Sequence, residues 1–336
     1  MFKFTISAIC FYILFLQSAC SEKHDLKKIR INGHTMGTQY NISVVVPSSF
    51  VITNDLKKDI DKLLVTINQQ MSTYIDDSEI SQFNDFKSTD WFAVSRDFLE
   101  VVTIAQKISQ ATHGAFDITI SPLVDLWGFG SETRLAVPHQ EQLTESLKHT
   151  GYEKLSLRNT PPAIRKKDKL LQIDLSAIAK GYAVDKVRKL LKTKGLNNFL
   201  VEIGGEISAS GTNQIGEIWK IAIENPENLP TKILTLKDIS VATSGDYRNF
   251  FIKNGKRFSH IINPKTGYPT SYKLASITVL DQSTVIADAY ATALLVMGEQ
   301  RAIIFIKKHK LKTHLFIREA STYRTWNSLD GTPPFF

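Results

Sequence analysis

The sequence predicts an α+β fold in a single body. Apolar residues follow helical spacing in some stretches and strand-like spacing in others, and a chain of 336 residues can bury a large core. No internal repeat, low-complexity tract or clear linker divides it. The strongest local signal is Asn254-Gly255, which predicts the turn of a β-hairpin over residues 249–261. These observations favour one α+β domain over a chain of separate modules.

The first segment is expected to be a targeting signal and not part of the fold. Residues 1–19 contain Lys3, then an apolar run over residues 4–16, then small Ser18 and Ala19. This order is typical of a secretory signal peptide, and the apolar run is too short for a membrane span. We therefore expect the protein to be exported.

Cys20 follows this signal directly. The sequence LQSAC resembles a bacterial lipobox, although Gln17 stands where lipoboxes usually carry Leu. Cys20 would then be lipidated, residues 20–28 would form a tether, and the protein would face the periplasm from a bacterial membrane, with the inner membrane favoured. The alternative is ordinary signal cleavage that leaves a free thiol. Because the only other cysteine is Cys10, the mature chain has no internal disulfide.

The folded domain is expected over residues 29–336. In its first part we predict a strand at 41–46 and helices at 55–69 and 98–112. Residues 114–130 mix glycines and a proline with large aromatic side chains, which predicts a loop that presents backbone and side chains. Core packing is the alternative explanation for Trp127 and Phe129.

Residues 172–187 carry the junction around which the rest of the chain is organised. We predict a strand at 170–175, an N-cap at Ser176 and a helix that ends before Gly195. The first N–H groups of a helix have no partner within it and lie at the positive end of its dipole, so this junction suits an anion or phosphate. The alternative is an ordinary turn with a solvated Asp174 and Lys180.

The remaining part of the chain is predicted to be mostly strands with two helices. The first expected strand covers 198–210 and ends in the Gly-Gly-Glu sequence of 204–206. The other expected strands cover 219–224, 232–241, 275–280 and 314–317. The expected helices cover 285–297 and 302–307. The formal charge is +8, but basic and acidic residues are interspersed. We interpret the basic run at 307–310 as a solvated helix face, with a membrane or nucleic-acid surface as the alternative. No nucleic-acid motif is present.

Several short motifs, taken together and in order, resemble those of the ApbE family of FAD:protein FMN transferases. The resemblance covers about residues 30–300. The motifs are MGT at 36–38, MSTY at 71–74, GAFD at 114–117 with WGFG at 127–130, DLSAIAKGY at 174–182, GGE at 204–206, TSGDY at 243–247, SH at 259–260 and ADAYAT at 287–292.

This resemblance implies mixed, largely antiparallel sheets with flanking helices. It also implies an enzyme that splits FAD with the help of Mg²⁺, attaches FMN through a phosphoester to a Thr or Ser of an acceptor flavoprotein, and releases AMP. The acceptor would be a subunit of a membrane redox complex or an exported flavoprotein. Two alternatives stay open: a Mg²⁺-dependent FAD pyrophosphatase that gives FMN and AMP, and a non-catalytic lipoprotein that only binds FAD.

A FAD site needs apolar or aromatic walls, N–H donors and a cation, because FAD has two flat ring systems and a pyrophosphate. By match to the family's motifs, the residues that would line it are Met36, Tyr74, Ala115, Phe116, Asp117, Asp174, Lys180 and Ile262. Lys180 departs from some relatives, which carry an acidic residue there.

The same resemblance implies a metal site and a catalytic histidine. Asp288 and Thr292 stand four residues apart and so share one helix face, and the family pattern adds the carbonyl of Ala177 as a Mg²⁺ ligand. The alternative for Asp288 is a helix cap. His260 would act as the base toward the acceptor hydroxyl or as a partner of the pyrophosphate. Ser244 and Asp246 are further candidates for the same pocket.

Overall fold

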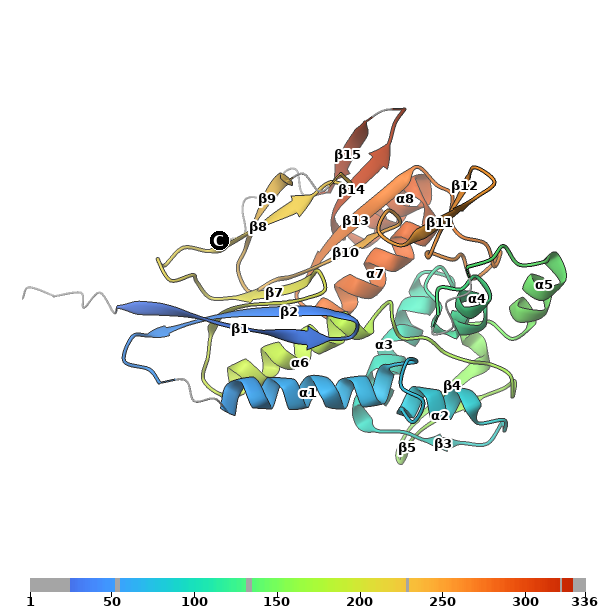
Figure 1. The fold of residues 1–336 in the computed structure, drawn as a ribbon, viewed down its shortest axis with the longest axis horizontal. Coiled ribbons are helices and arrows are strands. Elements are labelled where there is room, and N and C mark those ends of the chain that lie inside the picture. The colour runs from blue at the N-terminus through green and yellow to red at the C-terminus, as the bar shows by residue number, and fades with distance from the viewer. Residues whose placement is uncertain (1–24, 52–54, 131–134, 228–229, 321, 329–336) are drawn as a thin grey trace, which may run out of the picture.

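The computed structural model describes residues 25–51, 55–130, 135–227, 230–320 and 322–328. Its centre is an eight-stranded sheet in which all neighbouring strands are antiparallel (Figure 1). The strands of this sheet, in spatial order, are β1 (Leu26–Thr35), β2 (Thr38–Pro47), β6 (Asn198–Ile203), β7 (Glu206–Ser210), β10 (Ser240–Gly245), β13 (Leu274–Asp281), β14 (Lys312–Arg318) and β15 (Tyr323–Asn327).

Smaller sheets and helices surround the central sheet, and the predicted α+β class is confirmed. The smaller sheets are β3 (Phe92–Ala93) with β5 (Pro162–Lys166) and β4 (Leu155–Asn159), β8 (Trp219–Glu224) with β9 (Pro230–Leu236), and β11 (Phe250–Lys253) with β12 (Lys256–Ser259). The helices are α1 (Asp55–Met71), α2 (Glu79–Asp85), α3 (Arg96–Ala111), α4 (Ser121–Leu126), α5 (Gln140–Lys148), α6 (Ala179–Thr193), α7 (Thr284–Met297) and α8 (Glu299–His309).

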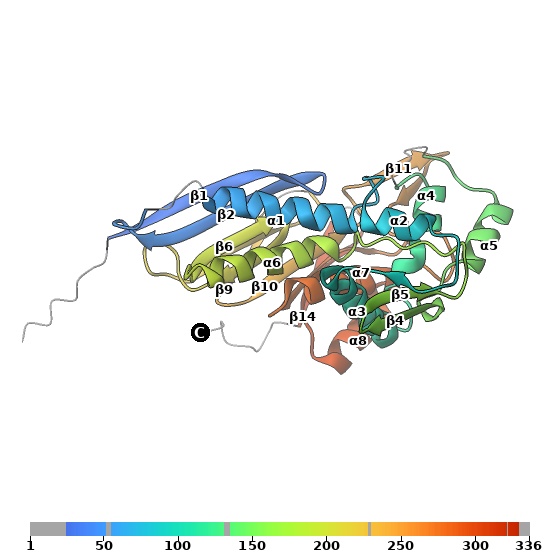
Figure 2. The same ribbon diagram turned by 90° about the horizontal axis from the view of Figure 1, so that it is seen from below.

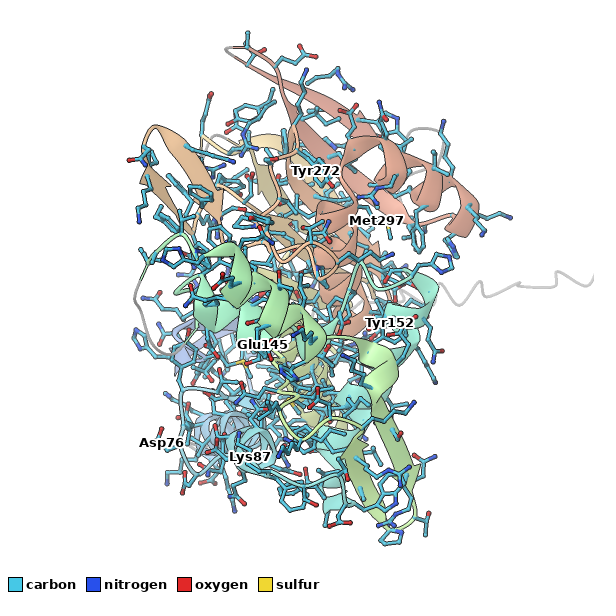
Figure 3. The ribbon with its side chains drawn as sticks, turned by 90° about the vertical axis from the view of Figure 1, so that its right-hand side faces the viewer. Asp76, Lys87, Glu145, Tyr152, Tyr272 and Met297 are labelled. Carbon is cyan, nitrogen blue, oxygen red and sulfur yellow. The ribbon has the colours of Figure 1, made fainter. Side chains whose placement is uncertain are left out.

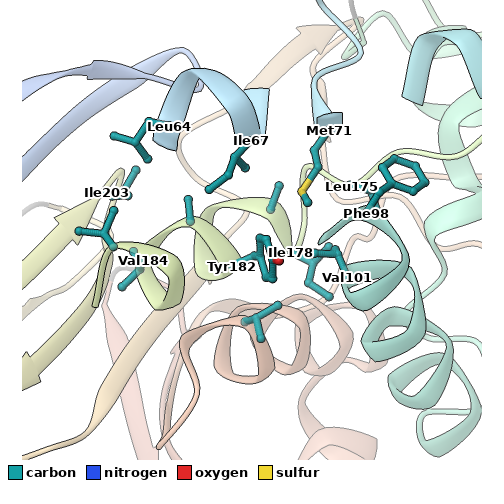
Figure 4. Close-up of a cluster of buried hydrophobic side chains, with 14 of the residues drawn as sticks. Leu64, Ile67, Met71, Phe98, Val101, Leu175, Ile178, Tyr182, Val184 and Ile203 are labelled. Carbon is teal, nitrogen blue, oxygen red and sulfur yellow. The ribbon is translucent and has the colours of Figure 1, made fainter. Parts of the chain in front are cut away.

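One face of the central sheet is covered by α1, α6 and α7 (Figure 2). Leu64 and Ile67 of α1 meet Tyr182 and Val184 of α6 in a buried apolar cluster (Figure 4). Successive residues of a strand point to opposite faces, so the alternate positions of the sheet form a second cluster beneath the β8–β9 hairpin. The sheet is therefore buried on both faces over much of its area.

Three expected boundaries are corrected by the structure. Strand β1 begins at Leu26, so the last residues of the predicted tether already belong to the fold. The predicted strand at 198–210 is a hairpin, because both glycines at 204–205 have positive φ and form the turn between β6 and β7. The predicted strand at 232–241 contains parts of both β9 and β10. Cys20 and the predicted signal peptide lie outside the described residues.

The predicted strand at 170–175 is wrong. The residue pattern is typical of a strand, but these residues pair with no strand among the described residues. Instead the side chain of Asn84 hydrogen-bonds both the N–H and the carbonyl of Ile173, at 2.8 and 2.9 Å. The fully buried ammonium of Lys166 donates to the Leu171 carbonyl at 3.0 Å. Side chains thus satisfy the backbone where a sheet neighbour was expected.

Helices α4 and α5 and the β11–β12 hairpin lie at the end of the molecule away from the start of β1 (Figure 1). The predicted loop at 114–130 contains α4 and a short 3₁₀ helix, η1 (Ile118–Ile120), and Trp127 is fully buried there. Figure 3 shows this end, with Glu145 of α5 near the centre and Tyr272 and Met297 above it. The sequence did not predict α2, α4, α5, β1, β3, β4, β5 or β15. No helix within the described ranges is long and apolar enough to cross a membrane.

Candidate active site

A cavity of about 570 Å³ lies where the start of α6, strand β10 and helix α7 meet. Most of the residues that the sequence singles out line it, although they come from distant parts of the chain. These residues are Ala115, Phe116, Asp117, Asp174, Ala177, Lys180, Ser244, His260, Ile262, Asp288 and Thr292. The fold therefore gathers the predicted flavin, metal and catalytic residues around one space.

The segment before α6 forms one wall of the cavity. The main chain of Asp174 donates to the Ile118 carbonyl at 2.7 Å, and its carboxylate accepts from the N–H of Ser176 at 2.7 Å. Burial raises the pKa of Asp174, against the hydrogen bond from Ser176. Ser176 itself is exposed and does not cap the helix, because α6 begins at Ala179 with Ile178 at the N-cap position. The predicted strand-to-helix junction is therefore a turn fixed by Asp174.

Lys180, in the first turn of α6, lies between two buried carboxylates. Its ammonium is 2.9 Å from Oε1 of Glu206. Burial by itself would lower the pKa of Lys180, but the negative charges of Asp288 and Glu206 outweigh it and raise the pKa. Burial also raises the pKa of both acids, against the charge of Lys180. The site thus holds two buried acids and one ammonium, an arrangement that a further cation would stabilise.

Close contact between α6 and α7 brings Asp288 to the start of α6. The N–H of Gly181 donates to Oδ2 of Asp288 at 2.9 Å. A Cβ at Gly181 would lie 2.5 Å from the Thr284 carbonyl oxygen and 2.8 Å from Cβ of Asp288, so only glycine permits this approach. Asp288 is 3% exposed and lies one turn into α7, beyond the N-terminal cap.

Thr292 lies one turn further along α7, where it contacts β10. Its hydroxyl is 3.0 Å from the hydroxyl of Ser244. Asp288, Thr292 and Ala177 all line the cavity. They can offer carboxylate, hydroxyl and carbonyl oxygens, the ligand types that Mg²⁺ prefers. No group of three or more His, Cys, Asp or Glu side chains that could hold a metal occurs in the described ranges.

His260 follows β12 and is fixed by one hydrogen bond. Its Nδ1 lies 2.9 Å from the carbonyl oxygen of Asn249. Since a carbonyl only accepts, Nδ1 carries the proton in the neutral ring and Nε2 is left as an acceptor. Burial lowers the pKa of His260, against this hydrogen bond. The ring is therefore held in the neutral form that can accept a proton.

The 115–118 segment supplies an apolar and a charged part of the wall. Phe116 is buried, and Asp117 is 8% exposed. The carboxylate of Asp117 accepts from the N–H of Thr119 at 2.8 Å and from the N–H of Tyr152 at 2.9 Å. Burial raises the pKa of Asp117, against these hydrogen bonds. Ile262 completes this wall from the other side and packs against Trp127.

Three of the predicted residues do not line the cavity. Met36 lies in the β1–β2 turn with φ of 50° and packs against the main core. Tyr74 is 67% exposed in the turn between α1 and α2. Asp246 is buried and forms ion pairs with Arg257 and Arg318. These arginines hold its carboxylate outside the cavity lining, so it is not the pocket residue that the sequence predicted.

Glu206 is a functional candidate to which the sequence assigned no role. It lines the cavity and is 2% exposed, and among the described residues its Oε2 has no hydrogen-bond partner. An unpartnered buried carboxylate oxygen is costly unless a ligand satisfies it. The available signal was the acidic residue directly after two glycines at a strand turn, but burial and the contact with Lys180 could only be seen in the fold.

Comparison with known proteins identifies the family of this chain. The model of the ApbE family matches residues 36–317. The chain is 40% identical over 324 residues to the FAD:protein FMN transferase of Vibrio cholerae, covering 95% of this chain and 96% of the relative. It is 39% identical to the enzyme of the same name from Haemophilus influenzae, covering 97% of this chain and 96% of that one.

Solved structures give the same result for the fold. The flavin transferase ApbE from Vibrio cholerae superimposes with a TM-score of 0.83 at 40% identity, covering 90% of this chain and 97% of that one. The apo form of the Pseudomonas stutzeri flavinyl transferase ApbE gives a TM-score of 0.85 at 35% identity, covering 91% and 96%. From the matched motifs, the shared fold and these relatives, this chain belongs to the ApbE family.

Proposed function

We infer that this chain is a FAD:protein FMN transferase, an enzyme that moves FMN from FAD to a hydroxyl of an acceptor protein. The observation that carries this inference is that one cavity brings Lys180, the start of α6, Asp288 and His260 together. The names of the relatives at up to 40% identity support the same activity. A pyrophosphate needs cations and N–H donors, and the cavity offers both.

In the proposed reaction, the oxygen of an acceptor Thr or Ser attacks the phosphorus on the FMN side of the pyrophosphate. A new O–P bond forms, the P–O bond to the AMP phosphate breaks, and AMP leaves with the bridging oxygen and its electron pair. The hydroxyl proton must go to a base. Lys180 would stabilise the charge on the phosphate oxygens, since it lines the cavity and its raised pKa keeps it protonated.

We propose His260 as that base. Its Nε2 is unprotonated in the tautomer fixed by the Asn249 carbonyl, and its lowered pKa keeps the ring neutral around pH 7. General base assistance of this kind contributes on the order of 10²- to 10⁴-fold. The alternative role, a hydrogen bond to the pyrophosphate, would use the protonated ring, which the buried setting disfavours.

The residues present fit a Mg²⁺ ion. Asp288, Thr292 and the Ala177 carbonyl would hold it, and the excess of buried carboxylate over ammonium at Lys180 supports a divalent cation nearby. When bound, Mg²⁺ would neutralise phosphate charge in the transition state. Asp288 also keeps its hydrogen bond from Gly181, which orients the carboxylate before any ion arrives.

The experiment that tests the proposed function uses the purified enzyme with FAD and Mg²⁺, with and without an acceptor flavoprotein. We expect AMP release to depend on the acceptor. Equally rapid AMP release without the acceptor would instead identify a FAD pyrophosphatase. Tight FAD binding with no metal-dependent turnover would identify a binding protein that delivers FAD.

We also propose that the protein is a lipoprotein anchored through Cys20 and facing the periplasm, with the inner membrane as its place and a membrane redox-complex subunit or an exported flavoprotein as its acceptor. The lipobox-like sequence before Cys20 supports this. The Cys20→Ala variant should keep its transferase activity and lose membrane association, because the lipid attached to Cys20 is the proposed anchor. Retention of that variant in the membrane fraction, after a salt wash, would refute the lipobox assignment.

A further inference from the structure

Strands β7 and β10 separate before they reach the cavity. Their pairing includes Ser240 with Ser208 and Val241 with Ile207, and then it stops. The next residues of β10 continue along the cavity wall, while β7 turns away at Glu206 into the glycines of the β6–β7 turn. One side of β10 therefore lacks a strand neighbour in the described part of the chain.

The register shows which peptide groups lie on that side. The N–H of Ala209 donates to the Ile239 carbonyl, so the odd-numbered residues of β10 direct their N–H and carbonyl groups toward β7. The N–H of Asp246 donates to the Ala275 carbonyl, so the even-numbered residues bond β13. Thr243 and Gly245 consequently present main-chain donors and acceptors away from β13, and both residues line the cavity.

Gly205, the residue that could continue the pairing with β10, donates its N–H to another group. If the register of β7 and β10 continued, Gly205 would stand opposite Thr243, but its N–H donates to Oε1 of Glu202 at 2.9 Å. A Cβ at Gly205 would meet no atom within 4 Å, so the space beside it is open. Gly205 and Thr243 both line the cavity, so the cavity reaches from the β6–β7 turn to the unpaired edge of β10. An unpaired strand edge beside open space is the setting in which an extended peptide adds to a sheet.

The position of this edge relative to the proposed chemistry identifies its occupant. The cavity-lining residues assigned to FAD come from 115–117, 174–180 and 262, which leaves Thr243 and Gly245 of β10 and the β8 part of the lining unassigned. Between Thr243 and Gly245 lies Ser244, whose hydroxyl contacts Thr292 one turn from Asp288. Residues directly opposite in a strand pair point their side chains to the same face, so a residue opposite Ser244 would point toward α7.

We propose that the open edge of β10 at Thr243 and Gly245 binds an extended segment of the acceptor protein as an added antiparallel strand. The residue that receives FMN then lies opposite Ser244, with its hydroxyl directed toward Thr292 and Asp288. The two residues that flank it exchange main-chain hydrogen bonds with Thr243 and Gly245. This inference rests on the proposed function, because it concerns the acceptor of that reaction.

The pairing specifies which amide groups of the acceptor matter. In an antiparallel pair the residues opposite Thr243 and Gly245 direct their N–H groups to β10, whereas the residue opposite Ser244 directs its N–H away. N-methylation removes an N–H donor and adds bulk at that point. It should therefore block transfer at the two residues flanking the modified threonine and be tolerated at the threonine itself.

The test uses the whole enzyme, FAD, Mg²⁺ and ten-residue peptides that span the modified threonine of the acceptor, each N-methylated at one position. FMN transfer is measured by mass spectrometry. We expect transfer to fall at least tenfold for methylation at either flanking residue, since each lost hydrogen bond is worth roughly 3- to 10-fold and the methyl group adds a clash. Methylation at the threonine nitrogen is the matched control, with near-normal transfer.

Any other pattern overturns the docking proposal. Equal transfer to all methylated peptides would mean that no strand forms and that the edge serves another ligand, such as the flavin ring. No transfer to the unmethylated peptide, with normal transfer to the intact acceptor, would mean that recognition lies outside an extended segment. Failure of transfer to the intact acceptor as well would refute the proposed function together with this inference.

Discussion

Asp288→Asn separates a metal ligand from a helix cap. Asn keeps the size of Asp288 and an oxygen that can accept from the Gly181 N–H, so the contact between α6 and α7 should survive. The substitution removes the negative charge of the Asp288 carboxylate, whose charged neighbours are Lys180 and Glu206. Each 1.36 kcal/mol is tenfold in rate, and loss of about 2.7 kcal/mol of charge stabilisation in the metal's shell should slow transfer about 10²-fold.

The assay is the rate of FMN transfer as a function of Mg²⁺ concentration for both proteins. We expect the Asn variant to need more Mg²⁺ and to recover part of its rate when Mg²⁺ is in excess. Superimposable curves for variant and wild type would refute the metal assignment. The free energy of unfolding should change little, because the hydrogen bond to α6 is kept.

Asp185→Asn provides the matched control on the same pair of helices. Asp185 accepts from the N–H groups of Thr284 and Val285 and from the Ser283 hydroxyl, so it caps α7 from α6. Replacing the Asp185 carboxylate should lower the free energy of unfolding by about 1 kcal/mol, in line with other N-cap changes. The Mg²⁺ dependence should stay that of the wild type, and a shifted curve would show that the assay reports helix packing and not metal binding.

Substitutions at His260, Gly181 and Lys166 test three other parts of the structure. His260→Gln should keep FAD binding, measured by fluorescence titration, and lose roughly 10²- to 10⁴-fold in the rate of transfer. In the wild type, the lowered pKa of His260 should keep transfer active as the pH falls through the ordinary histidine range. A loss of activity centred at the ordinary histidine pKa would contradict this role. Gly181→Ala should lower the urea-derived free energy of unfolding by about 1–3 kcal/mol, because its methyl group overlaps the Thr284 carbonyl, and an unchanged value would show that the helices can separate freely. Burial lowers the pKa of Lys166 to about 8, so between pH 8 and about 10 the unfolded chain binds more protons and the wild type should gain stability with pH, a gain that Lys166→Met should lack.

The sequence predicts most of the regular elements, because their signals are local. The helical spacing of α1 and the Asn254-Gly255 turn of the β11–β12 hairpin depend only on neighbouring residues, and both are confirmed. The extended segment before α6 was misassigned for the opposite reason. Its backbone partners are the side chains of Asn84 and Lys166, which are distant in sequence, and no local pattern reveals them.

Most of the predicted site residues line one cavity, but the contacts between them could not be predicted from the sequence. The ordered motifs name Lys180 and Asp288, which the fold brings together from α6 and α7. They do not indicate that Glu206 would be the ion-pair partner of Lys180, since that contact depends on the β6–β7 turn lying over the start of α6. They also place Asp246 in the pocket, whereas two arginines hold it in the fold.

We infer that this cavity transfers FMN to a protein hydroxyl. The most direct measurement is mass spectrometry of a candidate acceptor after incubation with the enzyme, FAD and Mg²⁺, together with the amount of AMP released. We predict that the acceptor gains one FMN on a Thr or Ser and that AMP appears in equal amount. AMP release with an acceptor of unchanged mass would contradict the claim.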